Sequence, residues 1–239
     1  MKFYADLHIH SALSPCADRD MTPNNIINMA VLKGLDIIAV TDHNSAENLP
    51  AVSECARKAG IVFIPGMEVE TREEIHLVCL FPHVEAAFAM QDVVYGALPD
   101  LKNREDIFGE QWILDEEDRL AGRQDRLLLT ATGLGIGDVF PLVKDLGGVV
   151  LPAHVDRDSY SVLSNLGSIP EDLPVRSLEI SRDCCLDSFL AVHPELNAYS
   201  FIRSSDAHYL WDISERENPL QLEEAGAECL MKALSEGNV

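Results

Sequence analysis

The chain has 239 residues, of which 47% are hydrophobic, and a formal net charge of −22 from 18 basic and 40 acidic side chains. This length and apolar content suit one α/β domain with a sizeable core, whereas the charge argues against binding long nucleic acids, which need a positive surface to displace counterions from phosphates. No apolar run approaches the ~20 residues of a membrane span and the start lacks a signal-peptide pattern, so we expect a cytoplasmic protein without a membrane partner.

The first third of the chain predicts strands that alternate with helices. We expect strands at 3–10, 36–41, 61–64 and 74–81, and helices at 22–34 and 47–59. Thr22 and Pro23 are an N-cap followed by proline at the first helical position, and Gly34 is typical of a helix end. Strands separated by helices pair in parallel through right-handed crossovers, so this alternation predicts an α/β sheet.

The pattern weakens between residues 84 and 135. We expect a helix at 84–94, followed by a charge-rich segment, 104–126, which we interpret as a helical insertion or lid with a solvated face. Three glycines at 133, 135 and 137 have a spacing that suggests a phosphate loop. They follow no clear strand, so we interpret them as a loop that leads into a helix at 138–145.

Regular alternation then resumes. We expect strands at 148–152, 175–181 and 201–205, and a terminal helix at 220–235. Neither a linker nor a repeat interrupts the chain, so we expect one domain over residues 1–239. In parallel α/β barrels the active site is assembled at the carboxyl ends of the strands.

Histidines gather at the ends of these predicted strands. His8 and His10 are two residues apart, so strand alternation places both imidazoles on one face. Six of the eight histidines lie in or just after predicted strands, with five carboxylates beside them: His8, His10, His43, His76, His154 and His208, and Asp6, Asp42, Glu68, Asp156 and Asp206. We interpret His83 and His193 as surface residues.

These residue types predict a catalytic metal centre. Imidazole and carboxylate ligands without thiolate suit zinc, manganese or iron, and the six cysteines, which form no CxxC pair, are expected to be mostly buried reduced thiols. The ligands exceed the capacity of one ion, so we expect two or three divalent ions with Glu68 as a bridging carboxylate. Such a cluster lowers the pKa of a bridging water and clamps the oxygens of a phosphate, which favours phosphate ester hydrolysis.

Five short motifs resemble, in order, those of the polymerase and histidinol phosphatase (PHP) superfamily. They are Asp6-Leu-His-Ile-His-Ser, Thr41-Asp-His, Gly66-Met-Glu with the downstream His76, Pro152-Ala-His and Ser205-Asp-Ala-His. The resemblance implies an α/β fold of the distorted, TIM-like (β/α)7 barrel type with a trinuclear metal site. It also implies a phosphoesterase that works through a metal-activated hydroxide.

The resemblance further implies an assignment of ligands. One ion would be held by His8, His10, Glu68 and Asp206, a second by Glu68, His76 and His154, and a third by His43 and His208. In the family the third site often has another ligand just after the serine of HxHSxxS, where this chain has Pro15, which cannot coordinate through its side chain. Asp18, Asp20 or Asp42 could substitute, or the third site is weak.

Catalysis and phosphate binding require donors beside the metals. We expect His208, Asp206 and Arg157 to act in catalysis, because the leaving oxygen takes its proton from a histidine or a bound water. The planar guanidinium group suits phosphate, and Arg157, Arg182 and Arg19 lie at strand ends or in the first loop. The expected substrate is a small phosphate monoester or nucleotide, with the segment 104–126 as a cap over the site.

Three other functions fit parts of the pattern. Some PHP domains of polymerases are metal-binding modules without catalysis, and the superfamily includes nucleases, which are phosphodiesterases. The ligand set is nearly complete, which weighs against the first, and the net charge weighs against a nuclease of long substrates. An amidohydrolase would share the HxH motif, but its bridging lysine has no counterpart at a strand end here.

Overall fold

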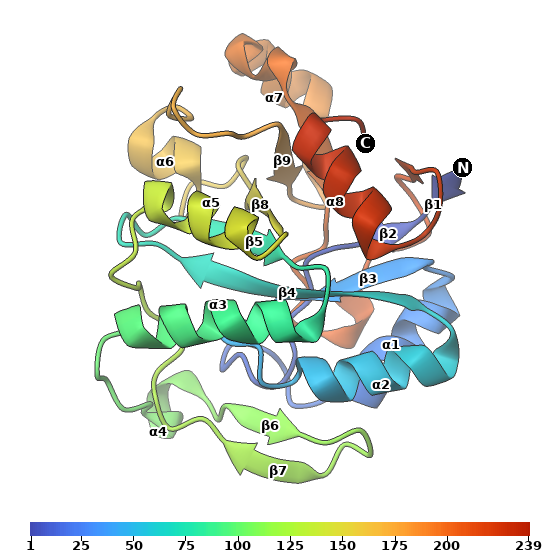
Figure 1. Cartoon of the computed structure of the whole chain (residues 1–239), viewed down its shortest axis with the longest axis vertical. Helices are drawn as coiled ribbons and strands as arrows, with labels where there is room; N and C mark the ends of the chain where they lie inside the picture. Colours follow the sequence, from blue (N-terminus) through green and yellow to red (C-terminus); the bar gives the residue numbers. More distant parts are fainter.

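A computed structural model describes all residues, 1–239, as an α/β fold (Figure 1). The strands are β1 (Lys2–Phe3), β2 (Ala5–Asp6), β3 (Ile37–Val40), β4 (Val62–Glu70), β5 (His76–Leu80), β6 (Trp112–Leu114), β7 (Leu120–Arg123), β8 (Val149–Pro152), β9 (Ser177–Ile180), β10 (Ser200–Arg203) and β11 (Leu220–Gln221). The helices are α1 (Pro23–Lys33), α2 (Leu49–Ala59), α3 (Val84–Ala97), α4 (Glu105–Phe108), α5 (Ile136–Asp145), α6 (Val162–Leu166), α7 (Leu186–Val192) and α8 (Ala227–Glu236), with two short 3₁₀ helices, η1 (Pro194–Ala198) and η2 (Leu210–Asp212). No helix combines the length and the apolar character that crossing a membrane requires.

The central sheet is curled, with the strand order β2-β3-β4-β5-β8. Strands β2, β3 and β4 pair in parallel, as the alternation of strands and helices predicted. Strands β9 and β10 form a separate parallel pair, and a single bridge between Ile9 and Ala207 links the segment after β2 to the segment after β10. The hydrogen-bonded ladder is therefore interrupted, and the structure shows a curled α/β sheet that does not close into the distorted (β/α)7 barrel that was expected.

Strand β5 runs antiparallel to both of its neighbours, β4 and β8. The connection from Glu70 to His76 is a short turn, in which Thr71 accepts the backbone N–H of Glu74 at 2.9 Å and Glu74 adopts a φ of 58°. A parallel pair needs a crossover of a dozen or more residues, so a turn of this length forces β5 to fold straight back along β4. This reversal matters for the site, because the first residue of β5 lies at the same edge of the sheet as the last residues of the parallel strands.

The first two long helices begin and end at the expected residues. Thr22 caps α1 by accepting the backbone N–H of Asn25 at 3.4 Å, and Gly34 ends the helix with a φ of 69°. Gly60 ends α2 in the same left-handed conformation. The glycines near 135 lead into α5 as a loop, as expected, where the Asp138 carboxylate accepts the backbone N–H of Gly135 at 2.8 Å.

The charge-rich segment 104–126 differs from the helical insertion that its sequence suggested. It contains only the single helical turn α4, and its centre is the antiparallel hairpin of β6 and β7. At the tip of this hairpin, the Asp115 carboxylate accepts backbone N–H groups from Glu117 and Arg119, and Asp118 adopts a φ of 61°. The charged residues that suggested a solvated helix face therefore form the turn of a hairpin, which is stabilised by the Asp115 carboxylate.

The hairpin and its flanking residues pack against the loop that follows β2. The backbone N–H of Trp112 donates to Ala12 at 2.9 Å, and the Asp118 carboxylate accepts the hydroxyl of Thr22 and the backbone N–H of Asn24. Figure 1 shows the hairpin below α2, at the side of the molecule opposite α7. This segment supports the first loop, and whether it also caps the substrate site stays a prediction.

Two apolar clusters hold these layers together. The larger contains 40 buried residues on the side of the sheet covered by α1, α2, α3 and α5, and the smaller contains 15 on the side covered by α8. Neighbouring residues such as Ile37 and Ile38 on β3 belong to different clusters, because alternate side chains of a strand point to opposite faces. Burial on both faces explains why the central strands read as continuous apolar runs.

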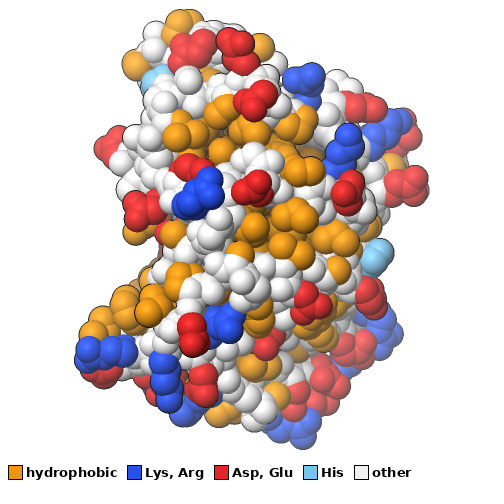
Figure 2. All heavy atoms as spheres, turned by 60° about the vertical axis from the view of Figure 1, so that its left-hand side comes forward, with side chains coloured by type: hydrophobic (Ala, Val, Ile, Leu, Met, Phe, Trp, Pro, Cys, Tyr) orange, Lys and Arg blue, Asp and Glu red, His pale blue; other side chains and the backbone are white.

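Acidic side chains outnumber basic ones, as the composition requires. On the face shown in Figure 2, Lys and Arg side chains lie scattered among Asp and Glu and form no continuous band. A protein that follows a nucleic-acid backbone usually presents such a band. This face therefore offers no extended track for a polyanion.

Candidate metal centre

The sheet brings the candidate ligands to one edge. His8 and His10 follow β2, His43 follows β3, and Glu68 lies near the end of β4. His76 is the first residue of β5, which reaches the same edge because that strand is antiparallel. His154 follows β8, and Asp206 and His208 follow β10, which completes the set of eight expected residues.

Glu68 lies at the centre of this cluster. Its side chain is buried, with Oε1 at 2.8 Å from Nδ1 of His76 and Oε2 at 2.9 Å from Nδ1 of His43. Three further imidazole nitrogens lie 3.3 to 3.4 Å from its oxygens, those of His8, His10 and His154. One carboxylate within reach of five imidazoles has the geometry of a bridging ligand, which is the role that the sequence suggested for it.

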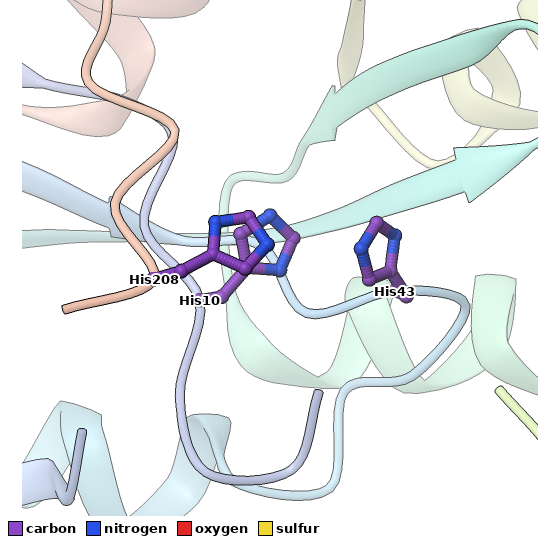
Figure 3. A group of neighbouring side chains, drawn as sticks. All are labelled: His10, His43 and His208. Carbon is purple, nitrogen blue, oxygen red and sulfur yellow. The ribbon is translucent and has the colours of Figure 1, made fainter. Parts of the chain in front are cut away.

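The ligand atoms form three overlapping groups, each compact enough to hold a metal ion. The groups are His8, His10, Glu68 and Asp206; His43, Glu68 and His76; and His10, His43 and His208. Figure 3 shows the third group, in which the imidazoles come from three different segments of the chain. The groups differ in part from the expected assignment, because His10 and His43 each belong to two of them, whereas His154, with Nε2 at 3.4 Å from Glu68, belongs to none.

The polar atoms of this cluster fit bound cations. Both oxygens of Glu68 are buried without a hydrogen bond of acceptable geometry, and so are Nδ1 of His43 and Nε2 of His76. Leaving a buried polar atom unpaired costs ~1–3 kcal/mol, and more for a charged group. Since zinc, manganese and iron all accept imidazole nitrogen and carboxylate oxygen, the donor set fits divalent ions.

A buried carboxylate behind His8 fixes the orientation of that ring. Nδ1 of His8 donates to Oε1 of Glu179 at 2.9 Å, and the same oxygen accepts the backbone N–H of His154 at 3.1 Å. With Nδ1 engaged in this way, Nε2 of His8 is left as the acceptor that faces Glu68 and Asp206. Sequence reasoning missed Glu179, whose only signal is an acidic residue inside the apolar strand β9.

A second chain of hydrogen bonds orients His10. The Ser14 hydroxyl donates to Oδ1 of Asp42 at 2.6 Å, so its oxygen accepts from Nδ1 of His10 at 3.0 Å and from the backbone N–H of His43 at 3.1 Å. The other oxygen of Asp42 accepts the Ser11 hydroxyl at 2.6 Å. Both oxygens of Asp42, which the sequence offered as a metal ligand, are therefore occupied by serines, and Asp42 belongs to none of the three ligand groups.

The buried charges shift the pKa values of the ligands. Burial raises the pKa of Glu68, but the positive charges of His76, His8 and His43 outweigh it and hold that pKa well below its usual range. Burial also disfavours protonation of His8, yet the charges of Glu179, Glu68 and Asp206 raise its pKa well above the ordinary value. The carboxylates are thus held in the ionised form that binds metal.

Of the three candidate arginines, only Arg157 lies at the cluster. Its Nη1 atom is 2.5 Å from Oδ2 of Asp206, and its side chain remains 41% exposed. Arg182 instead contacts Asp212, and Arg19 pairs with Glu110 at 2.7 Å while it stacks over the ring of Trp112. Both therefore point away from the cluster, because strand-end position alone does not determine where a long side chain reaches.

The cluster opens into a pocket of about 280 Å³. Besides the candidate ligands, the pocket is lined by Cys16, Glu70, Leu129, Arg157, Ser159 and Tyr160. The ring of Tyr160 stacks on His76 with 4.7 Å between centroids, and burial raises the pKa of Glu70 to about 7. Burial opposes ionisation of Cys16, but charges and hydrogen bonds from His43 and His208 lower its pKa to about 7.

Several residues around the pocket adopt left-handed backbone conformations. The φ angles are 30° for His154, 51° for Asp206 and 54° for Tyr160, none of which is glycine. Such conformations cost about 1–3 kcal/mol each and persist where the surrounding structure enforces them, often at functional sites. The strain therefore coincides with the residues that the cluster uses.

Comparisons of the sequence with known proteins identify a family. The sequence model of the PHP domain matches residues 6–133. The chain is 24% identical to the uncharacterized protein YqxK of Bacillus subtilis in an alignment that covers 94% of the chain and 59% of YqxK. It is 35% identical over 78 residues to a 3′,5′-nucleoside bisphosphate phosphatase from Chromobacterium violaceum, which corresponds to 31% of the chain and 26% of that phosphatase.

A lesion-specific endonuclease from Pyrococcus furiosus shares the fold. Its crystal structure superposes with a TM-score of 0.69 at 21% sequence identity and covers 98% of this chain and 56% of the endonuclease. The chain therefore spans no more than 59% of the length of any of these three proteins. At this identity, the likeness to the endonuclease shows a common fold.

Proposed function

The chain belongs to the PHP domain family, and from that premise we propose that it is a metal-dependent phosphoesterase that hydrolyses a small phosphate monoester or nucleotide. The observation that carries this proposal is the position of Glu68. A fully buried carboxylate that faces five imidazoles and lies in two of the three ligand groups is suited to bridge two cations. Bridged cations are typical of enzymes that displace groups at phosphorus.

Divalent ions held in these groups would supply Lewis-acid activation of the phosphoryl group and of the attacking water. The residues of the chain would bind these ions and orient the ligands. Glu179 and the Ser14–Asp42 pair hold the rings of His8 and His10 so that their Nε2 atoms converge. Preorganised donors lower the barrier, because the site does not have to rearrange as charge develops.

Arg157 and His208 are proposed to act directly on the substrate. Arg157 lines the pocket and pairs with Asp206 through Nη1, so its remaining N–H groups are available to a phosphate oxygen. His208 lines the same pocket, and Nδ1 of its ring lies 2.8 Å from the carbonyl oxygen of Asp206. Nδ1 donates in that hydrogen bond, so Nε2 is free to hold a metal or to exchange a proton.

The pocket supports a small substrate. A volume of about 280 Å³ lies just below the usual range for ligand sites, ~300–1,000 Å³, which suits a phosphate with a modest leaving group. The net charge of −22 opposes the approach of a long polyanion. The nuclease alternative is supported by the likeness to the archaeal endonuclease over 98% of the chain, so the test includes an oligonucleotide.

The test is hydrolysis by the purified protein with added zinc, manganese or iron. The substrates are a phosphomonoester, a nucleoside 3′,5′-bisphosphate, a generic phosphodiester and a short oligonucleotide. We expect monoester turnover, and a loss of more than ~10²-fold in Glu68→Gln, which exceeds the loss for partners behind a ligand. Glu85→Gln, at an exposed position on α3, is the matched control and should behave as wild type.

Two results would contradict the proposal. Oligonucleotide cleavage without monoester turnover would favour a nuclease. Bound metal with no turnover on any substrate would favour a metal-binding module that acts without catalysis.

A further inference from the structure

One wall of the pocket is an aromatic ring that the proposed chemistry does not use. The ring of Tyr160 stacks on the imidazole of His76, with 4.7 Å between the ring centroids and 24° between the ring planes. Tyr160 is nonetheless 47% exposed, whereas His76 is 7% exposed. Because the imidazole covers one face of the tyrosine ring and the residue lines the pocket, the opposite face is open to a ligand.

The backbone holds this ring in place before any ligand binds. The carbonyl oxygen of Tyr160 accepts the backbone N–H of His76 at 2.9 Å, and Tyr160 adopts a φ of 54°. A tyrosine keeps this left-handed conformation only where the surrounding structure enforces it. The next residue, Ser161, caps α6 by accepting the backbone N–H of Ser164 at 3.1 Å, and its hydroxyl donates to the carbonyl oxygen of Arg157 at 2.8 Å.

The loop between β8 and α6 carries three groups that face the same pocket. Nε2 of His154 lies 3.4 Å from Oε1 of Glu68, at the ligand cluster. Arg157 follows three residues later and Tyr160 three residues after that, and all three line the pocket. The backbone N–H of Arg157 donates to the carbonyl oxygen of His154 at 2.9 Å, so the loop turns tightly between them. A phosphate held by the cluster and Arg157 would therefore have Tyr160 beside its ester substituent.

Leu129 supplies the other large apolar side chain of the pocket. The side-chain amide of Asn44 donates to the carbonyl oxygens of Leu128 at 2.8 Å and Thr130 at 3.0 Å, which fixes the backbone on both sides of Leu129. Apart from Cys16, the remaining lining side chains are carboxylates, imidazoles, a guanidinium group and a hydroxyl. A pocket of this composition suits a ligand that is anionic at one end and an uncharged ring at the other.

We propose that Tyr160 determines specificity by stacking its open face on a planar aromatic ring in the leaving group, as in the base of a nucleoside monophosphate. This inference names the substrate class and rests on the proposed phosphoesterase function. Stacking of a base on an aromatic side chain tolerates different bases and is worth about 5–150-fold in affinity. Recognition by stacking needs no positive charge beyond that at the phosphate, which suits a protein with a net charge of −22.

Adenosine 5′-monophosphate and ribose 5-phosphate are a matched pair of probes, because they share the phosphate and the ribose and differ in the adenine ring. Isothermal titration calorimetry measures how the metal-loaded protein binds their hydrolysis-resistant phosphonate analogues, and kcat/KM is measured on the phosphates themselves. We expect both measurements to favour the adenosine compound by about 5–150-fold in the wild-type protein.

The ratio between the two probes separates stacking from a structural role of Tyr160. Tyr160→Asn should bring the ratio close to one, and asparagine is chosen because it tolerates the left-handed backbone. Tyr160→Phe should keep the ratio, because the ring remains. A tyrosine that only supported His76 would weaken both probes equally and leave the ratio unchanged. Tyr209→Asn, at an exposed tyrosine outside the pocket that stacks on Trp211, is the matched control and should keep the wild-type ratio.

The outcome is separable from that of the phosphoesterase proposal. Equal binding of the two analogues by the wild-type protein, or an unchanged ratio in Tyr160→Asn, would overturn the role of Tyr160, and turnover of both phosphates would then still support a phosphoesterase. A preference for the adenosine analogue that disappears in Tyr160→Asn, without turnover of either phosphate, would overturn the phosphoesterase proposal and leave the stacking site in place. Binding of neither analogue and turnover of neither phosphate would overturn both.

Discussion

The two ends of the histidine cluster are built differently. The inner group of His8, His10, Glu68 and Asp206 is buried, and carboxylates and hydroxyls behind it fix its imidazoles. Of the outer pair, His43 is buried like the inner ligands, whereas the side chain of His208 is 24% exposed in the pocket. One cluster therefore combines an inner group whose imidazoles are fixed by buried partners with an outer pair, His43 and His208, carried by the segments after β3 and β10. We expect ions at the inner group to bind more tightly than an ion at the outer pair.

Among residues that do not belong to a ligand group, the largest expected effect comes from Glu179, which supports His8 in the inner group. Glu179→Gln can no longer stabilise a positive charge on His8, and its amide group can hold the ring in either tautomer. Loss of such a partner lowers metal affinity by about 10–100-fold. Competition with a fluorescent chelator measures this change. Glu171→Gln, at an exposed position before β9, serves as the control, and equal affinities in the two variants would show that Glu179 has no such role.

Metal binding at the inner group should depend on pH through the protonation of His8. The carboxylates around His8 raise its pKa well above the ordinary value, so in the metal-free protein a proton occupies this ring below that pKa. A metal must displace the proton, and affinity should therefore fall as the pH decreases, by up to about tenfold per pH unit for each proton displaced. Dialysis at a series of pH values, followed by metal analysis, measures the effect. In Glu179→Gln the fall should begin at lower pH, and an unchanged profile would count against the assignment.

The smallest effect should come from the contact between Gly109 and Pro15, which lies in the loop that follows β2. Gly109 has a φ of 99° and faces the carbonyl oxygen of Pro15, so Gly109→Ala should cost about 1–3 kcal/mol of stability. Gly96→Ala is the matched control, since the interior of α3 leaves open space for a methyl group and should gain about 0.5–1 kcal/mol. Chemical denaturation measures both. Equal free energies of unfolding for the two variants would mean that the close contact between Gly109 and Pro15 does not limit the stability of the protein.

The sequence predicted that these histidines and carboxylates gather at one edge of the sheet, because each belongs to a short local pattern at the end of a strand; their role as metal ligands stays a prediction. The sequence did not indicate the residues that hydrogen-bond these ligands and orient their rings. Nothing near Glu179 in the sequence indicates that β9 lies beside His8, a separation of 171 residues along the chain. The cysteines were expected to be mostly buried, whereas Cys16 is exposed and lines the pocket beside His43 and His208, which come from distant segments. Residues that act through tertiary contacts carry no local signal.

Two features of the fold, the reversal at β5 and the hairpin of β6 and β7, have no clear signal in the sequence. The turn after Glu70 lacks the Asn-Gly or Gly-containing pairs typical of tight hairpins, so the reversal at β5 left no clear mark in the sequence. The segment around Asp115 is rich in charges that equally suit a helix surface. Only their hydrogen bonds to the backbone of Glu117 and Arg119 show that they form a turn.

The bridge between Ile9 and Ala207 has a consequence for how the protein matures. Asp206 and His208 leave the ribosome nearly two hundred residues after His8 and His10, so a growing chain displays imidazoles without their final partners. The bridge between Ile9 and Ala207 is expected to form late, because closing such a long loop costs entropy before any contact repays it. Metal loading at the inner group is therefore expected near the end of folding, and a truncated chain would remain unable to assemble this centre.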